Sequence, residues 1–180
     1  IVWIFITTPL MYILFFIIGF IFVLKKIFDS WLDSKNKYFF QIFDNFSKQQ
    51  DFIFIIIFLI PLFAAGYFGS ISYDGWRHLY FVYPSFLLIS ITGIDFLKSM
   101  LKKNYKYLYI LILLILTPTF LWMYKNHPHQ YVYFNILAGK NFNKSFEMDY
   151  FGISNKKALE YIIASEKRDI KVFNLSTTDL

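Results

Sequence analysis

The chain has 180 residues, of which 57% are hydrophobic and 23% aromatic, and it carries a formal net charge of +6. This composition is too apolar for an ordinary soluble domain of the same length, so a membrane protein is expected. Cysteine is absent, which excludes a disulfide framework and a thiolate metal site. The basic balance is weak evidence for a nucleic-acid partner, and none is predicted.

Apolar segments long enough to cross a membrane recur along the first two thirds of the chain. A spanning helix needs about 20 mostly apolar residues. Prolines lie within these segments, with Pro61 in the second and Pro118 in the fourth, and they are tolerated where neighbouring helices satisfy the freed carbonyl groups. Asp95, near the end of the third segment, is expected to pair with Lys98. The predicted fold is an all-α polytopic membrane bundle over residues 1–124. Its four spans are residues 1–24, 52–68, 79–97 and 107–124.

Lysines gather in two of the loops between these spans. Short cytoplasmic loops accumulate Lys and Arg. The loops 25–51 and 98–106 carry nine lysines, whereas the loop 69–78 carries Arg77 alone. The first two loops are therefore expected in the cytoplasm, and the third loop, the tail and both ends of the chain on the exoplasmic side. The nine lysines are Lys25, Lys26, Lys35, Lys37, Lys48, Lys98, Lys102, Lys103 and Lys106.

The stretch "YDGWRHLYFVYP", residues 73–84, places Tyr73, Asp74, Arg77 and His78 at the exoplasmic mouth of the third span. The planar guanidinium of arginine binds carboxylate or phosphate through two parallel hydrogen bonds, so a phosphate-bearing ligand is one interpretation. The alternative is an interfacial arginine that reaches lipid headgroups or pairs with Asp74. The aromatic residues of the stretch fit the ordinary belt at a membrane surface.

A second polar stretch, "NHPHQYVYFN", follows the fourth span directly. His127 and His129 are two residues apart, which in an extended segment places both on one face. A metal site needs at least one further ligand, for which His78, Glu147 and Asp149 are candidates. Nothing in the sequence fixes their distances, so no metal or cofactor is predicted, and interfacial structure or ligand contact is the favoured interpretation.

Residues 125–180 are predicted to form an exoplasmic tail with the start of a small α/β segment. Ser154 is expected to cap a helix that continues to about Lys167, and Ile170–Leu175 has the pattern of a strand. No glycine-rich phosphate loop, nucleophile elbow or HExxH pattern occurs. Because the chain begins inside an apolar run and ends soon after the predicted strand, it is expected to continue at both ends.

The order of three motifs resembles a known family. "YDGWRHLYFVYP", then "HPHQYVYFN", then "FEMDYFGISNKKALEYI" is similar to the C-terminal half of bacterial multi-spanning glycosyltransferases related to the dolichyl-phosphate-mannose protein mannosyltransferases, glycosyltransferase family 39. The likeness covers roughly residues 50–165. It implies the GT-C membrane fold, a polyprenyl-phosphate-linked sugar donor, a lipid, protein or glycan acceptor, and transfer on the outer face of the bacterial inner membrane.

The resemblance also implies roles for individual residues. Arg77 would hold the donor phosphate, and Asp74 and His78 would shape its pocket. Tyr73 and the two histidines of the second stretch, His127 and His129, would contact substrate. The catalytic acid of the family lies near the N-terminus, so it is expected upstream of residue 1, no catalytic residue is assigned, and the isolated chain is expected to be inactive.

Two other functional classes remain open from the sequence. A transporter or flippase for a lipid-linked or anionic solute would also use proline-interrupted spans and an arginine at the mouth of the bundle. A non-catalytic membrane subunit with an exoplasmic domain is the third hypothesis. An inverted repeat of the four spans in the upstream sequence would favour the transporter, and an acidic residue in an early outside loop would favour the transferase.

Overall fold

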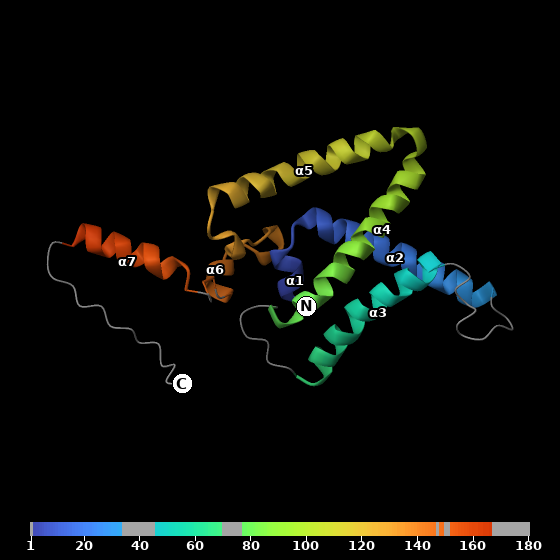
Figure 1. Cartoon of the computed structure of the whole chain (residues 1–180), viewed down its shortest axis with the longest axis horizontal. Helices are drawn as coiled ribbons and strands as arrows, with labels where there is room; N and C mark the ends of the chain where they lie inside the picture. The colour runs from blue at the N-terminus through green and yellow to red at the C-terminus, as the bar shows by residue number, and fades with distance from the viewer. Residues whose placement is uncertain (1, 34–45, 70–76, 147, 150–151, 167–180) are drawn as a thin grey trace. The chain divides into compact units, whose positions relative to one another are not determined.

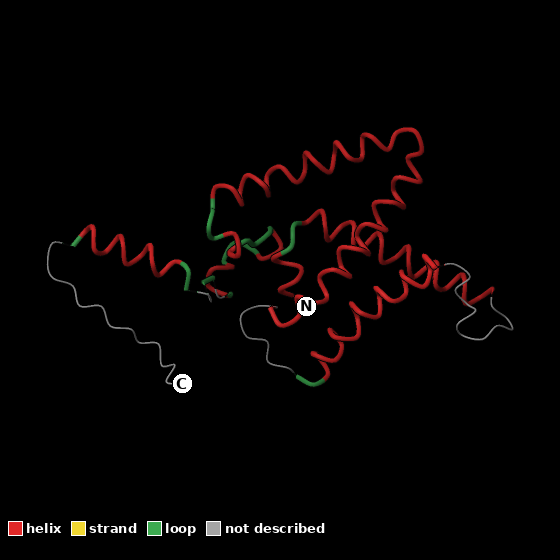
Figure 2. The backbone as a smooth tube through the Cα atoms, viewed as in Figure 1, coloured by secondary structure: helices red, strands yellow, loops and turns green. Residues whose placement is uncertain are grey.

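The structure is a computed structural model that describes residues 2–33, 46–69, 77–146, 148–149 and 152–166. It contains two compact units, residues 1–147 and 148–180. Within the described residues the chain forms helices and loops and no strand (Figure 2). The predicted all-α class is therefore confirmed, whereas the α/β segment gains no support, because its strand at 170–175 lies outside the described residues.

The first predicted span is two helices and not one. α1 (Val2–Thr7) ends where the chain reaches Thr8 and Pro9, and α2 (Leu10–Asp33) begins directly after them (Figure 1). Proline has no backbone N–H and disfavours helical geometry in the residue before it, so Thr8 leaves the helix. The prediction of one span over residues 1–24 was wrong, because the long helix starts at Leu10 and continues nine residues beyond Leu24 to Asp33.

Among the described residues, three helical stretches are long and apolar enough to cross a membrane, whereas four spans were predicted. This finding supports a membrane protein. They are Leu10–Leu32 in α2, Phe46–Tyr67, which is α3, and Arg77–Lys125. The third stretch consists of four consecutive elements. These are η2 (Arg77–Val82), α4 (Tyr83–Leu101), η3 (Lys102–Asn104) and α5 (Tyr105–Lys125).

The ring contacts of α2 show the directions of its neighbours. Phe16 packs on Phe58 of α3 and on Phe86 of α4, with ring centroids 4.8 Å and 4.6 Å apart. Further along α2, Lys26 pairs with Asp51, an earlier residue of α3, so α2 and α3 are antiparallel. Phe22 stacks on Phe96, a later residue of α4, at 4.4 Å, so α2 and α4 are parallel. The core of the first unit lies where these three helices meet.

Two glycines mark the closest approach of α2 and α4. A Cβ atom on Gly19 would overlap the carbonyl oxygen of Ile89, and one on Gly93 would overlap the carbonyl oxygen of Phe15. Small residues at such a crossing let helix backbones approach without intervening side chains. Ser90 lies beside the crossing, buried, and donates its hydroxyl to Phe86 O at 2.8 Å.

The end of α4 differs from its prediction. Lys98 does not pair with Asp95 among the ion pairs of the described residues, and its ammonium lies 5.6 Å from the ring centroid of Tyr105. Lys102, at φ 47°, ends α4 and starts the short turn into α5. α5 buries only Leu108, so most of its apolar surface is exposed as in a helix that faces lipid.

The second unit contains α7 (Ser154–Ser165). The predicted helix is present, but Ser154 does not cap it. The carboxylate of Asp149 accepts from the backbone N–H groups of Ile153 and Ser154 at 3.1 Å and 3.0 Å, and the Ser154 hydroxyl also donates to it. A carboxylate satisfies the first free N–H groups of a helix better than a hydroxyl does, because it accepts several bonds and carries negative charge.

Candidate ligand-binding site

The structure describes four of the six predicted site residues. Arg77 and His78 open η2 and have exposed side chains. His127 is exposed just after α5, and His129 is half-buried. Tyr73 and Asp74 lie outside the described residues, so their predicted roles stay predictions.

Asn135 attaches the segment after α5 to the open end of α1. Its side-chain amide donates to the carbonyl oxygens of Phe5 and Thr8, each at 2.6 Å, and its backbone N–H donates to Ile6 O at 2.8 Å. Its Oδ1 accepts from the N–H of Leu137 at 2.8 Å. The last carbonyls of a helix have no partner within the helix, so Asn135 replaces the hydrogen bonds that the break at Pro9 removes.

Aromatic contacts strengthen the same attachment. Trp3 of α1 packs on Phe134 and Phe146, with ring centroids 5.7 Å and 5.1 Å apart. Trp122, near the end of α5, packs edge-on against Tyr133 at 5.1 Å. These contacts join the segment after α5 to the first unit, where the sequence predicted a separate tail from residue 125. The segment contains η4 (Gln130–Val132), η5 (Ile136–Ala138) and α6 (Phe142–Ser145).

Replacing Asn135 with alanine should destabilise the first unit. Buried carbonyl groups left without a donor cost about 1–3 kcal/mol each, so we expect the free energy of unfolding to fall by at least about 2 kcal/mol. Asn135→Asp should be no better, because a carboxylate has the same shape but cannot donate. Unfolding in mixed micelles, followed by circular dichroism, measures the effect.

The matched control is Asn126→Ala. Asn126 is exposed, and its amide donates only to Trp122 O, at 2.8 Å, where water can replace it. This substitution should cost under about 1 kcal/mol. Equal losses for the two alanine variants would show that Asn135 does not hold the segment to α1.

A cavity of about 400 Å³, called here the tyrosine cavity, lies where three segments of the first unit meet. They are the break between α1 and α2, the join of η2 and α4, and the segment fixed by Asn135. The two polar stretches of the sequence were predicted to lie at the same end of the bundle, and the cavity contains residues of both. It is lined by Thr7, Thr8, Pro9, Tyr80, Tyr83, Gln130, Tyr131 and Tyr133.

None of the four described site residues is among the residues that line this cavity, but three of them adjoin it. In a 3₁₀ helix, residues three apart lie above one another with a rise of about 6 Å. Arg77 therefore lies one turn of η2 from Tyr80, on the same edge of that helix. The amide of Gln130, a lining residue, lies 2.7 Å from Nδ1 of His127. His129 packs on the ring of Tyr131 at 6.2 Å.

The lining tyrosines were not predicted as site residues, because tyrosines at such positions have a more ordinary interpretation. Tyrosines beside an apolar span are typical of the belt at the membrane surface. The available signal was their spacing, with tyrosines three apart in "YFVY" and two apart in "YVY", next to the charged residues. Thr7 and Thr8 carried no signal, because the break that exposes them was not expected.

The described lining of the cavity combines hydrogen-bonding groups with aromatic rings. Its hydroxyl groups donate and accept hydrogen bonds, its rings offer apolar faces, and none of the described residues that line it is a carboxylate. In the part of the chain that the structure describes, no three His, Asp or Glu side chains are grouped to hold a metal ion, and the candidate Glu147 lies outside that part.

Comparisons of the chain with protein-family models, curated proteins and solved structures found no match.

Proposed function

We propose that the chain is part of an integral-membrane glycosyltransferase and that the tyrosine cavity binds the sugar head of a polyprenyl-phosphate-linked donor. The observation that best supports this proposal is the cavity, which has a volume of about 400 Å³ and is lined by Tyr80, Tyr83, Tyr131 and Tyr133 among other residues. Ligand sites of this size combine apolar walls with a few polar groups. A sugar ring presents apolar C–H faces, which pack on aromatic rings, and hydroxyl groups, which bond to tyrosine, threonine and Gln130.

Arg77 is the proposed partner of the donor phosphate. It is placed one helical turn from the wall of the cavity, and its guanidinium matches phosphate through two parallel hydrogen bonds. The polyprenyl tail then lies against the exposed apolar faces of the helices. Asp74, His78 and Tyr73 are proposed to complete the phosphate side, and His127 acts through Gln130 on the sugar side.

In this proposal α4 and α5 cross the membrane separately, which gives four spans. They have 19 and 21 residues, and at 1.5 Å per residue each reaches about the 30 Å of the hydrocarbon layer. The antiparallel α2–α3 and parallel α2–α4 contacts agree with alternating crossings. The lysine-rich loops then face the cytoplasm and the tyrosine cavity faces outward, which impermeant labelling of single cysteines at Lys103 and Lys125 would check.

In this proposal no residue of the chain is assigned as the acceptor of the proton. In an inverting displacement, the acceptor hydroxyl attacks the anomeric carbon, the bond from that carbon to the phosphate oxygen breaks, and a carboxylate takes the hydroxyl proton. Polyprenyl phosphate leaves with the negative charge, and Arg77 would stabilise that charge. The described residues would supply donor binding and leaving-group stabilisation.

Donor binding tests the proposal directly. The chain in lipid nanodiscs should bind a radiolabelled undecaprenyl-phosphate hexose saturably, and unlabelled undecaprenyl phosphate should compete, whereas a nucleotide sugar should not. Tyr131→Ala should weaken binding about tenfold, the effect of one lost contact of roughly 1.4 kcal/mol. Tyr109→Ala, on the exposed face of α5, should have no effect. Absence of saturable binding would overturn the proposal, and movement of the intact donor between leaflets without sugar transfer would favour the transporter.

A further inference from the structure

A second cavity, called here the α2–α4 groove, lies at the opposite end of α2 from the tyrosine cavity. It has a volume of about 440 Å³. Residues 18, 22, 25 and 29 of α2 are three or four apart, so they form one stripe along the helix. Phe22 and Phe96 both line the groove, and their rings are stacked with centroids 4.4 Å apart. Its lining residues are Ile18, Ile21, Phe22, Lys25, Lys26, Asp29 and Phe96.

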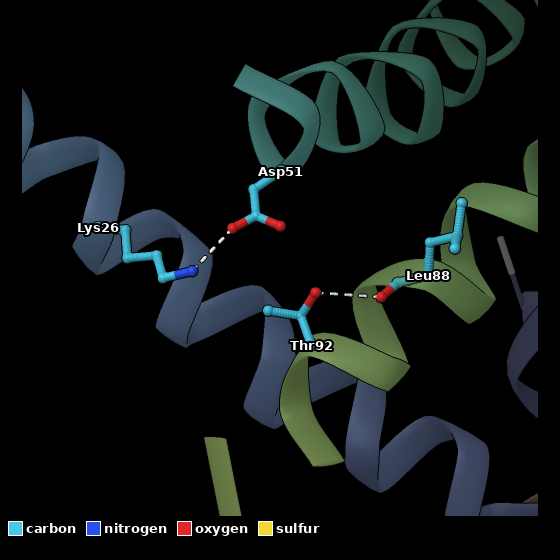
Figure 3. A network of polar contacts seen from close by, with 4 residues as sticks. All are labelled: Lys26, Asp51, Leu88 and Thr92. Atoms are coloured by element: carbon cyan, nitrogen blue, oxygen red, sulfur yellow. Dashed lines mark hydrogen bonds and ion pairs between the residues drawn. The ribbon is translucent and has the colours of Figure 1, made fainter. Parts of the chain in front are cut away.

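One of the two lysines in the groove is already neutralised. Lys26 donates to Asp51 of α3 at 2.9 Å, and Figure 3 shows the two side chains pointing toward each other. The Asp51 side chain is only 9% exposed, and the Lys26 ammonium also lies 4.7 Å from the ring centroid of Phe22. This pair therefore links α2 to α3 and contributes little net charge to the groove.

Lys25 and Asp29 are the remaining charges. Both side chains are exposed, and neither makes an ion pair with another described residue. They are four residues apart on α2, where β-carbons are separated by about 5–6 Å. Lys25 is also the first charge after the apolar run of α2, so the two groups lie at the depth of the lipid headgroups.

We propose that the α2–α4 groove binds phosphatidylethanolamine. Its phosphate lies on Lys25, its primary ammonium donates to Asp29, and its acyl chains cover Ile18, Ile21 and Phe96. A headgroup with one negative and one positive charge, separated by two carbons, matches one lysine and one aspartate a helical turn apart. Phosphatidylcholine carries a quaternary ammonium that cannot donate a hydrogen bond, and phosphatidylglycerol carries no positive charge. This inference does not rest on the proposed function.

Lipid binding to the purified chain tests the inference. Native mass spectrometry in dodecyl maltoside, with dioleoyl phosphatidylethanolamine, phosphatidylcholine and phosphatidylglycerol added in turn, gives three affinities. We expect phosphatidylethanolamine to bind about tenfold more tightly than phosphatidylcholine, the ratio for one charge-assisted hydrogen bond. Asp29→Asn should remove this preference, and Lys25→Gln should weaken the binding of all three lipids.

Matched variants separate this site from general surface charge. Asp95→Asn changes an exposed aspartate of α4 outside the groove and should leave the preference intact. Ile21→Trp should fill the groove and weaken binding without disturbing the core, because Ile21 is 61% exposed. Equal affinity for the ethanolamine and choline lipids in the unmodified chain would overturn the proposal. Tighter binding of phosphatidylglycerol that is unaffected by Asp29→Asn would overturn it as well.

Discussion

Replacing Gly93 with alanine should separate α2 from α4 and sharply lower the stability of the membrane bundle. The new Cβ would overlap the carbonyl oxygen of Phe15 and would lie 2.8 Å from the backbone nitrogen of Gly19. Overpacking costs about 1–3 kcal/mol, and the upper end is expected here because backbone atoms cannot rotate away as a side chain does. Gly19→Ala should have a similar effect, since its Cβ would overlap Ile89 O.

Gly66 provides the control for this substitution. It lies inside α3, and a Cβ atom there would meet no other atom within 4 Å. Alanine is the better helix former by about 1 kcal/mol, so Gly66→Ala should leave the bundle unchanged or slightly more stable. The free energy of unfolding in mixed dodecyl maltoside and dodecyl sulfate micelles distinguishes the variants. If Gly93→Ala proved as stable as Gly66→Ala, α2 and α4 would not cross at these glycines.

Arg77→Lys should weaken binding of the polyprenyl-phosphate donor about ten- to a hundredfold while the helices remain folded. Lysine keeps the charge but loses the planar pair of donors that matches a phosphate. A hydrogen bond to a charged group contributes about 1.5–3 kcal/mol, and about 1.4 kcal/mol corresponds to tenfold in affinity. The measurement is donor binding at subsaturating concentration in nanodiscs, with helix content recorded by circular dichroism.

Lys125→Gln is the comparison for Arg77→Lys. Lys125 ends α5 and is exposed at the same end of the bundle, but it does not line the tyrosine cavity. Removing its charge should change donor affinity less than twofold. Unaltered affinity in Arg77→Lys would identify Arg77 as an interfacial residue whose charge reaches the lipid headgroups, and another group would then hold the phosphate.

Apolar length predicted most of the helices but could not locate the break at Pro9. Pro61 and Pro118 lie within α3 and α5, so a proline in an apolar run does not by itself end a helix. What differs at Pro9 is that another part of the chain satisfies the carbonyls of α1. That partner is Asn135, and a contact so distant in sequence leaves no local pattern.

The candidate site was predictable in its position and not in its composition. The alternating spans predicted from the sequence would bring "YDGWRHLYFVYP" and "NHPHQYVYFN" to one end of the bundle, and the structure shows a cavity lined by residues from both. Which side chains line it depends on the turn of η2 and on the path after α5, and neither follows from hydropathy. The histidines were therefore expected in the pocket that the tyrosines line.

The bond from Asn135 to Phe5 has a consequence for the order in which the protein is made. The two residues are separated by 130 positions, so most of the first unit must be synthesised before they can form this hydrogen bond. Closing so long a loop is entropically unfavourable until the helices between have packed. The last carbonyls of α1 therefore have no donor from Asn135 until the segment after α5 has been synthesised, and the tyrosine cavity is expected to be one of the last features to form.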